Sequence, residues 1–260
     1  MREIELSVVL PCYNEMAVLH DSVRRIVDVL SIAKWPAELI FVDDGSTDGT
    51  REELVACAEA AHGIPSRVIL HEHNMGRGRT VADGLRAARG WIAGYLDIDL
   101  EVDACYIPIL ALEIERGADV AYGWRYYNVL RETWVRFVCS RGYIRLVSRL
   151  LGTPRMDTES GYKFFNRERI LPLLDSIRSD HWFWDTEIMI RSYMAGMKIV
   201  FWPVLFRRRR EKQSTLRLWR DIRDYLGHLR GLRRELGAAT SDAAVAPGRA
   251  DGALPVEQDR

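Results

Sequence analysis

The sequence has few cysteines, and none is paired by its spacing. The four are Cys12, Cys57, Cys105 and Cys139, and no Cys-x-x-Cys occurs among the 260 residues. This spacing excludes the usual zinc and redox motifs. A chain of this length can build a sizeable core without a disulfide framework. We therefore expect a reducing, cytoplasmic compartment.

Long apolar runs and an excess of charge of either sign are also missing. No segment reaches the ~18 apolar residues that a membrane span needs. Residues 1–3 lead directly into an apolar run, which is not the pattern of a cleavable leader. The 37 basic and 37 acidic residues cancel, so net charge indicates no partner. Any membrane contact is therefore expected to be peripheral, on the inner face of the bilayer.

Short apolar runs alternate with segments of helical period along the chain. The expected strands are residues 6–10, 38–42, 68–70, 92–96, 119–123 and 198–201. The expected helices are residues 16–33, 48–61, 78–89, 104–117, 128–151 and 183–195. This alternation predicts an α/β fold, a Rossmann-like, mostly parallel sheet with helices on both faces. Ligands of such sheets bind beyond the carboxyl ends of the strands, where the polar clusters of this chain fall.

The first polar cluster is Asp97-Ile98-Asp99, at the end of an expected strand. Alternate residues of a strand point to the same side, so both carboxylates can face one point. Hard oxygen ligands suit Mg²⁺ or Mn²⁺, with substrate phosphates completing the shell. Glu101 is a candidate third metal ligand. The alternative is a solvated acidic turn.

Two further clusters follow other strands. Asp43 and Asp44 end one strand, where a carboxylate can accept hydrogen bonds from a base edge or a ribose. The alternative for residues 46–48 is an Asx turn and a helix N-cap. Asn74, Gly76 and Arg77 lie in a glycine-rich turn before a helix, where backbone N–H groups suit a phosphate. The alternative there is a simple loop.

The order of these motifs resembles that of the family 2 glycosyltransferases. The motifs are Pro11-Cys12-Tyr13-Asn14-Glu15, then Val42 to Thr50, then Asn74-x-Gly76-Arg77-Gly78, then Asp97-x-Asp99. The resemblance implies a GT-A fold, a nucleotide-diphospho-sugar donor and a divalent metal. The donor contacts it implies are Pro11, Tyr13, Glu15, Asp43, Asp44, Asn74, Gly76, Arg77, Asp97 and Lys163.

The second half resembles the dolichol-phosphate mannose synthase branch of that family. The similar segments are Gly123 to Tyr126, Ser148 to Gly152, Asp157 to Phe164 and Trp184 to Glu187. In that branch the metal is held by the D-x-D pair and by a residue two positions on. That residue is usually Gln and is Glu101 here. The arginine expected to touch phosphate is Arg125.

One departure concerns the end of the branch's pattern, where an arginine is followed by a Ser-Lys pair. Arg209 supplies the arginine, but Ser214 is followed by Thr215, so one expected phosphate contact is missing. Arg210 or Lys212 could substitute. The Q-x-x-R-W signature of processive polysaccharide synthases is not present either.

Asp185 distinguishes two hypotheses for the acceptor. The resemblance implies inverting transfer of a hexose, from a donor such as GDP-mannose or UDP-glucose, to a polyprenyl or dolichyl phosphate. That acceptor is already anionic and needs no base, so Asp185 would position substrate or an arginine. The alternative is a soluble transferase acting on a hydroxyl or amine of a small-molecule or cell-envelope acceptor, with Asp185 as base. In both, Arg125 and Arg209 would stabilise the leaving diphosphate.

Residues 214–236 are predicted to form a basic amphipathic helix after a transferase domain of residues 1–213. Between residues 205 and 236, eleven Arg and Lys stand against four Asp and Glu, a net charge of +7. Such a helix can lie in an anionic membrane interface, or pack on its own domain with its arginines solvated. Residues 237–260 are predicted to be a disordered tail. No nucleic-acid partner is expected, because no known binding module is visible.

Overall fold

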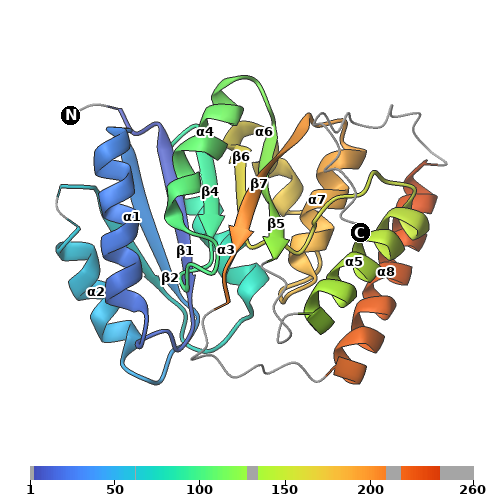
Figure 1. The fold of residues 1–260 in the computed structure, drawn as a ribbon, viewed down its shortest axis with the longest axis horizontal. Helices are drawn as coiled ribbons and strands as arrows, with labels where there is room; N and C mark the ends of the chain where they lie inside the picture. The colour runs from blue at the N-terminus through green and yellow to red at the C-terminus, as the bar shows by residue number, and fades with distance from the viewer. Residues whose placement is uncertain (1–2, 62, 128–133, 209–217, 241–260) are drawn as a thin grey trace.

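The computed structural model describes residues 3–61, 63–127, 134–208 and 218–240. Within these residues one sheet has the strand order β3-β2-β1-β4-β6-β5-β7 (Figure 1). Its strands are β1 (Leu6–Cys12), β2 (Ala37–Asp43), β3 (Ser66–Leu70), β4 (Ile92–Leu96), β5 (Val120–Tyr127), β6 (Tyr162–Asn166) and β7 (Ile199–Phe206). The pairs β1–β2, β2–β3, β1–β4 and β5–β7 are parallel, while β6 runs antiparallel to β4 and β5. The predicted mostly parallel sheet is thus confirmed.

Helices cover both faces of this sheet. They are α1 (Leu19–Ala33), α2 (Thr50–Glu59), α3 (Arg77–Ala87), α4 (Ile107–Glu115), α5 (Trp134–Leu151), α6 (Arg167–Leu174), α7 (Trp184–Met194) and α8 (Leu218–Thr240), with a short 3₁₀ helix at Ala104–Tyr106. The expected helix of residues 104–117 is therefore divided. Asp103 caps its 3₁₀ turn by accepting a hydrogen bond from the N–H of Cys105 at 2.8 Å.

The alternation of side chains along the strands produces two cores. Leu6, Val8 and Leu10 of β1 belong to the core under α1, α2 and α4. Val9 belongs to the core on the opposite face, under α3 and the helices of the second half. Since successive residues of a strand point to opposite faces, a strand buried on both sides must be apolar throughout. This is why β1 was readable from the sequence.

The strand β6 and the helix α6 were not predicted from the sequence. β6 contains Lys163 between large apolar residues, and all of Tyr162 to Phe165 are buried. A buried lysine breaks the apolar signal on which strand prediction relies. Helix α6 has only eight residues with Pro172 inside, which hides its period.

Helix α8 lies beside α5, on the side of the fold opposite α1 and α2 (Figure 1). Leu229 and Leu232 of α8 are buried, and the ring of Tyr225 lies 5.5 Å from that of Tyr143 on α5. Arg191 of α7 pairs with Glu235 at 3.0 Å. The apolar side of this helix thus packs on its own domain, which was one of the two alternatives. The helix reaches Thr240, beyond the predicted boundary at 236; residues 214–217 and 241–260 of the predicted segments lie outside the described residues.

No helix in the described part of the chain combines the length and the apolar character that crossing a bilayer requires.

Gly94 provides a test of how tightly β4 and β6 pack. The two strands pair Gly94 with Phe164, and a Cβ on Gly94 would lie 2.3 Å from the Phe164 ring. We expect Gly94→Ala to lower the free energy of unfolding by about 1–3 kcal/mol, because the buried ring must shift. The measurement is chemical denaturation.

Gly142→Ala is the matched control for this variant. Gly142 is exposed within α5, and a Cβ there meets nothing within 4 Å. Gly142→Ala should leave the free energy of unfolding unchanged or raise it by up to about 1 kcal/mol, since alanine favours the helix. Equal midpoints for the two variants would contradict the packing described for Gly94.

Candidate functional site

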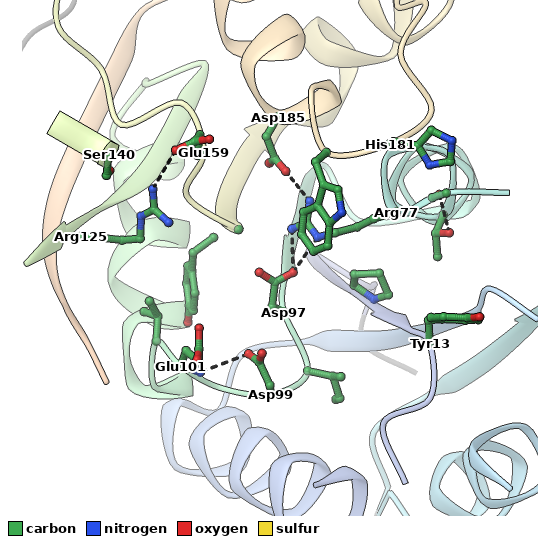
Figure 2. Close-up of a pocket in the computed structure, with 18 of the residues that line it drawn as sticks. Tyr13, Arg77, Asp97, Asp99, Glu101, Arg125, Ser140, Glu159, His181 and Asp185 are labelled. Carbon is green, nitrogen blue, oxygen red and sulfur yellow. Dashed lines mark hydrogen bonds and ion pairs between the residues drawn. The ribbon is translucent and has the colours of Figure 1, made fainter. Parts of the chain in front are cut away.

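A cavity of about 1080 Å³ lies beyond the carboxyl ends of β1, β2 and β4. The chain continues from β1 to β2 and β3 on one side, while β4 lies on the other, so the cavity sits where the strand order reverses. Open α/β sheets bind ligands at this point. The predicted site residues that line it are Pro11, Tyr13, Glu15, Asp44, Asn74, Gly76, Arg77, Asp97, Asp99, Glu101, Arg125 and Asp185 (Figure 2).

Three predicted site residues are placed otherwise. Asp43 and Lys163 are fully buried and do not line the cavity. Arg209 lies outside the described residues, although its neighbour Arg208 lines the cavity. The roles predicted for Asp43, Lys163 and Arg209 in ligand binding stay predictions.

Hydrogen bonds from its own residues stabilise the loop after β2. Asp43 accepts hydrogen bonds from the N–H groups of Gly45 and Ser46 at 3.2 and 3.3 Å, and from Nε of Arg51 at 3.0 Å. Asp48 accepts one from the N–H of Thr50 at 3.0 Å. The Asp48 contact is the Asx turn of the alternative for residues 46–48. The N-cap of α2 is Gly49, which makes no side-chain cap hydrogen bond.

Asp44 connects β2 to the glycine-rich turn. Its carboxylate accepts hydrogen bonds from the N–H groups of Met75 and Gly76 at 2.8 and 3.0 Å, and its Oδ1 lies 3.0 Å from Nδ1 of His71. Gly76 has φ +100°, a conformation that side chains disfavour. The two N–H groups that suited a phosphate are therefore bound to a carboxylate of the protein itself.

The three predicted metal ligands follow β4 in a tight turn. Leu100 has φ +50°, and its N–H donates to the carbonyl of Asp97 at 3.1 Å. Asp99 accepts a hydrogen bond from the N–H of Glu101 at 3.2 Å. Among the residues that the structure describes, no group of three or more His, Cys, Asp or Glu side chains is gathered to hold a metal.

A two-carboxylate site nevertheless fits the chemistry of a divalent ion here. Asp97 and Asp99 both line the cavity, and 40% of the Asp97 side chain is exposed to it. Mg²⁺ is commonly held by one or two carboxylates, with substrate phosphates and water supplying the other oxygens. The donor set is thus suited to an ion that arrives with a diphosphate.

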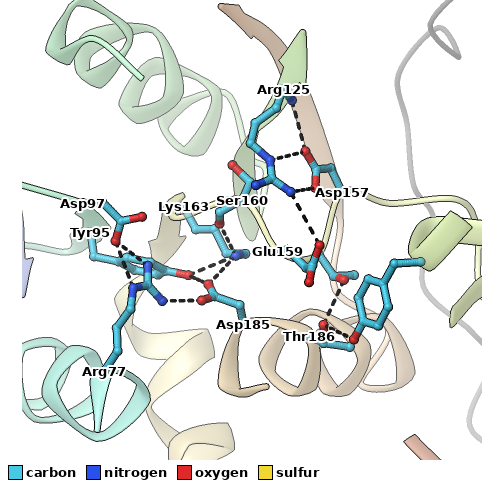
Figure 3. A network of polar contacts seen from close by, with 12 residues as sticks. Arg77, Tyr95, Asp97, Arg125, Asp157, Glu159, Ser160, Lys163, Asp185 and Thr186 are labelled. Atoms are coloured by element: carbon cyan, nitrogen blue, oxygen red, sulfur yellow. Dashed lines mark hydrogen bonds and ion pairs between the residues drawn. The ribbon is translucent and has the colours of Figure 1, made fainter. Parts of the chain in front are cut away.

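A cluster of buried charges joins the end of β4 to α3, β6 and α7 (Figure 3). Arg77 donates to Asp97 Oδ1 through Nε at 2.9 Å and Nη2 at 2.6 Å, and to Asp185 through Nη1. Lys163 donates to Asp185 at 2.6 Å and to the hydroxyl of Tyr95 at 3.0 Å. The Tyr95 hydroxyl in turn donates to Asp185. Burial alone would raise the pKa of Asp185, but Arg77 and Lys163 outweigh it, so the pKa lies below its usual value.

A second cluster lies on the other side of the cavity (Figure 2). Arg125 of β5 donates to Asp157 through Nε at 2.8 Å and Nη2 at 2.7 Å, a bidentate ion pair. Its Nη2 also lies 3.8 Å from Glu159. Burial, together with the charges of Asp157 and Asp185, raises the pKa of Glu159 to about 7, although Arg125 opposes this shift.

Several residues of these clusters were not assigned roles from the sequence. Asp157 and Glu159 were part of a quoted motif, but the partner of each becomes visible only when β5 and β6 lie side by side. Tyr95 was read as a strand residue. Trp182, 62% exposed, lines the cavity with its ring 5.2 Å from the Arg77 guanidinium. A tryptophan two residues before the Trp184-Asp185 motif was the available signal.

The cavity extends from these polar groups into an apolar slot between α5 and α8. Tyr143 and Leu146 line it from α5, and Tyr225, Leu226 and Leu229 line it from α8. The site therefore combines a polar floor at the strand ends with an apolar wall made by two helices.

The profile of the family described as "Glycosyl transferase family 2" matches residues 7–237. Glycosyltransferase AglD of Haloferax volcanii is 34% identical over 230 residues, which cover 86% of this chain and 36% of that protein. A dolichyl-phosphate beta-glucosyltransferase of Saccharomyces cerevisiae is 27% identical over 225 residues, covering 78% of this chain and 66% of that protein. The chain thus spans little more than a third of the first relative.

Glucosyl-3-phosphoglycerate synthase from Mycobacterium tuberculosis has a similar structure. Its complex with Mn²⁺, UDP and glucosyl-3-phosphoglycerate superimposes on this chain with a TM-score of 0.60 and 21% sequence identity. The match covers 94% of this chain and 81% of that one. At this identity the likeness shows a shared fold, and the predicted GT-A fold is confirmed.

The raised pKa of Glu159 predicts a pH-dependent stability. Its carboxyl keeps a proton in the folded protein up to about pH 7 but loses it near pH 4.5 when unfolded. The folded state therefore binds more protons between these values, and this contribution to stability is lost as pH rises from 4.5 through 7. Glu159→Gln does not titrate, so its melting temperature relative to wild type should increase between pH 5 and pH 8.

Thermal unfolding of both proteins across this pH range gives the measurement. Titrating groups that do not interact with Glu159 are common to both proteins and cancel in the difference. A difference in melting temperature that stays constant with pH would contradict the assigned environment of Glu159.

Proposed function

The chain belongs to the family 2 glycosyltransferases, and from that membership we propose that it moves a hexose from a nucleotide-diphospho-sugar to a polyprenyl or dolichyl phosphate. In this proposal the anomeric carbon is inverted, and Mg²⁺ or Mn²⁺ is required. GDP-mannose and UDP-glucose are the donors to test first. The observation that carries the proposal is a single cavity with a polar floor and an apolar slot.

The polar floor suits the diphosphate of the donor. Asp97 and Asp99 would hold the divalent ion, which neutralises the negative charge that grows on the leaving diphosphate. Arg77 lies beside them and adds a fixed positive charge. Tyr13 is 47% exposed at the end of β1 and is available to contact the base or the ribose.

The apolar slot suits a prenyl chain. Its walls are the side chains of α5 and α8 named above, and Arg125, Glu159 and Ser140 line the same cavity. A phosphate near Arg125 would leave the attached chain to lie along the slot. The dolichyl-phosphate glucosyltransferase of yeast, by its name, uses an acceptor of this class.

The surroundings of Asp185 favour an acceptor that is already anionic. One carboxylate oxygen accepts from Lys163 and Tyr95, and the other accepts from Arg77. A carboxylate with a lowered pKa and occupied oxygens is a weak general base. In the transfer step an acceptor phosphate oxygen attacks the anomeric carbon and the bond from that carbon to the diphosphate breaks. The nucleoside diphosphate leaves, and no proton has to be removed from the acceptor.

Contact with a membrane surface belongs to the same proposal. Arg230, Arg233 and Arg234 are exposed on α8, and Trp134 and Val138 are exposed on α5, the helix that forms the opposite wall of the slot. Exposed arginines attract anionic lipids, and exposed aromatic side chains settle at the headgroup level. A lipid acceptor could then enter the slot from the bilayer.

The direct test is transfer from radiolabelled GDP-mannose and UDP-glucose to a short polyprenyl phosphate in detergent. We expect an organic-extractable product with Mg²⁺ or Mn²⁺ and none with EDTA. The matched control acceptor is the unphosphorylated polyprenol. Product from the polyprenol, or only from soluble hydroxyl acceptors, would favour the alternative, a soluble transferase with Asp185 as base.

A variant of the slot makes this test more specific. Leu226→Glu places a charge in the apolar wall and should raise the KM for polyprenyl phosphate without affecting metal-dependent hydrolysis of the donor. Arg230→Glu, exposed on the same helix, is its control in detergent. Equal effects of the two variants would contradict the assignment of the slot to the acceptor.

The role of Asp185 gives a separate prediction. Asp185→Asn should lower the kcat for a phosphate acceptor by less than about 10-fold, whereas losing a general base costs about 10²- to 10⁴-fold. It should also lower the melting temperature, because Lys163 would be buried without its partner. The measurements are steady-state kinetics and thermal unfolding.

Lys163→Met/Asp185→Asn is the companion variant, because it leaves no unpaired buried lysine. Its fold should be more stable than that of Asp185→Asn. A kcat reduced by 10²-fold or more in both folded variants would identify Asp185 as a base and overturn the proposed role.

A further inference from the structure

Arg77 occupies the centre of the cavity floor (Figure 2). Two of its nitrogens donate to one oxygen of Asp97 and a third donates to Asp185. The guanidinium also lies 5.2 and 5.5 Å from the ring centroids of Trp182 and Tyr95. Only 11% of its side chain is exposed, so Arg77 is held in place from several sides.

Arg77 engages one of the two oxygens of Asp97, and the other lies beside Gly161. Oδ1 accepts both hydrogen bonds from Arg77. Oδ2 packs against the backbone of Gly161, since a Cβ on that glycine would lie 1.9 Å from it. An ion that binds Oδ1 of Asp97 must therefore displace or share the contacts of Arg77, and an ion on Oδ2 would share the same carboxylate with the guanidinium.

The charges around Arg77 already balance. Arg77 and Lys163 are matched by Asp97 and Asp185, with ion pairs of 2.6 Å between Arg77 and Asp97 and between Lys163 and Asp185. Burial alone would lower the pKa of Arg77, but the two carboxylates outweigh this and raise it, so the guanidinium stays charged. A bare divalent ion held by Asp97 and Asp99 would place two positive charges directly beside the Arg77 guanidinium in a partly buried site, and this repulsion is unfavourable.

We propose, building on the metal-dependent transfer above, that Arg77 holds Asp97 in place of the divalent ion and admits the ion only together with a diphosphate. The diphosphate supplies the negative charge that balances the incoming ion. Arg77 keeps its ion pair with Asp185. The N–H groups that it withdraws from Asp97 then donate to a phosphate oxygen, for which a guanidinium is well shaped. The consequence is strong coupling between metal and nucleotide binding, set by one arginine.

Mn²⁺ binding to the full chain tests this proposal without an activity assay. Titrations followed by electron paramagnetic resonance and calorimetry use Mn²⁺ alone, and then Mn²⁺ with UDP or with GDP. Wild type should bind Mn²⁺ alone weakly and bind it more tightly with a nucleotide, by a factor within the ~5- to 150-fold usual for coupled sites. Arg77→Met should bind Mn²⁺ alone about 10-fold more tightly than wild type and show less coupling.

Four variants make the result specific. Arg79→Met removes a charge two residues away, from a side chain that pairs with Asp83 and does not line the cavity, and should behave as wild type. Arg77→Lys keeps the charge and should keep the affinity for Mn²⁺ alone low. In Arg77→Met/Asp97→Asn the gain in affinity for Mn²⁺ alone should disappear, since that gain depends on Asp97. Arg77→Gln is a second neutral replacement, should Arg77→Met fail to fold.

Two results would overturn the inference. One is an affinity for Mn²⁺ alone that is equal or lower in the folded Arg77→Met and Arg77→Gln variants than in wild type. The other is no Mn²⁺ binding to any variant, with or without a nucleotide. Product formation with and without EDTA judges the proposed transfer separately, so a failure of the transfer can be distinguished from a failure of the role of Arg77.

Discussion

The buried carboxylate of Asp185 is the interaction on which the floor of the cavity depends. A carboxylate with 2% exposure is tolerated only when cations and hydrogen bonds satisfy it. Its partners are Lys163 from β6, Arg77 from α3 and Tyr95 from β4, while Asp185 itself is on α7. Four elements that are distant in the sequence thus meet at one group. Any shift of α3 or α7 on the sheet would leave a buried charge unpaired, so the cluster fixes both helices and, through Arg77, the position of Asp97.

The protein pairs the groups that we propose to bind ligands with charges of its own. Asp44 occupies the N–H groups of the glycine-rich turn, and Asp157 occupies Arg125 as a bidentate partner. Groups arranged in this way are oriented before any ligand arrives, which reduces the ordering that binding requires. Binding then exchanges one anion for another. A ligand with too little charge, or with its charge misplaced, cannot displace the internal carboxylate, so this arrangement favours selectivity over affinity.

The sequence predicted the first half of the fold well and the second half less completely. Strands such as β1 and β4 are apolar throughout, and the polar motifs directly after them locate the edge of the sheet where the cavity lies. β6 was hidden because Lys163 interrupts its apolar residues, and the burial of this lysine makes sense only with Asp185 beside it. In the same way, periodicity does not reveal that Arg77 faces Asp97 rather than open solvent. The identities of site residues follow from local motifs, whereas their pairings depend on contacts between segments far apart in the chain.

The positions of the two arginines agree with a displacement that inverts the anomeric carbon. Such a reaction requires the attacking oxygen and the leaving oxygen on opposite sides of that carbon. Arg77 and Arg125 lie on opposite sides of Asp97 in the cavity (Figure 2), each held by a carboxylate. In the proposed transfer, Arg77 accompanies the leaving diphosphate, and Arg125, next to the apolar slot, accompanies the attacking phosphate. Because Arg77 is on α3 and Arg125 is on β5, different neighbours fix the two arginines. A sugar bound between them would meet an anion from each side, as an in-line reaction requires.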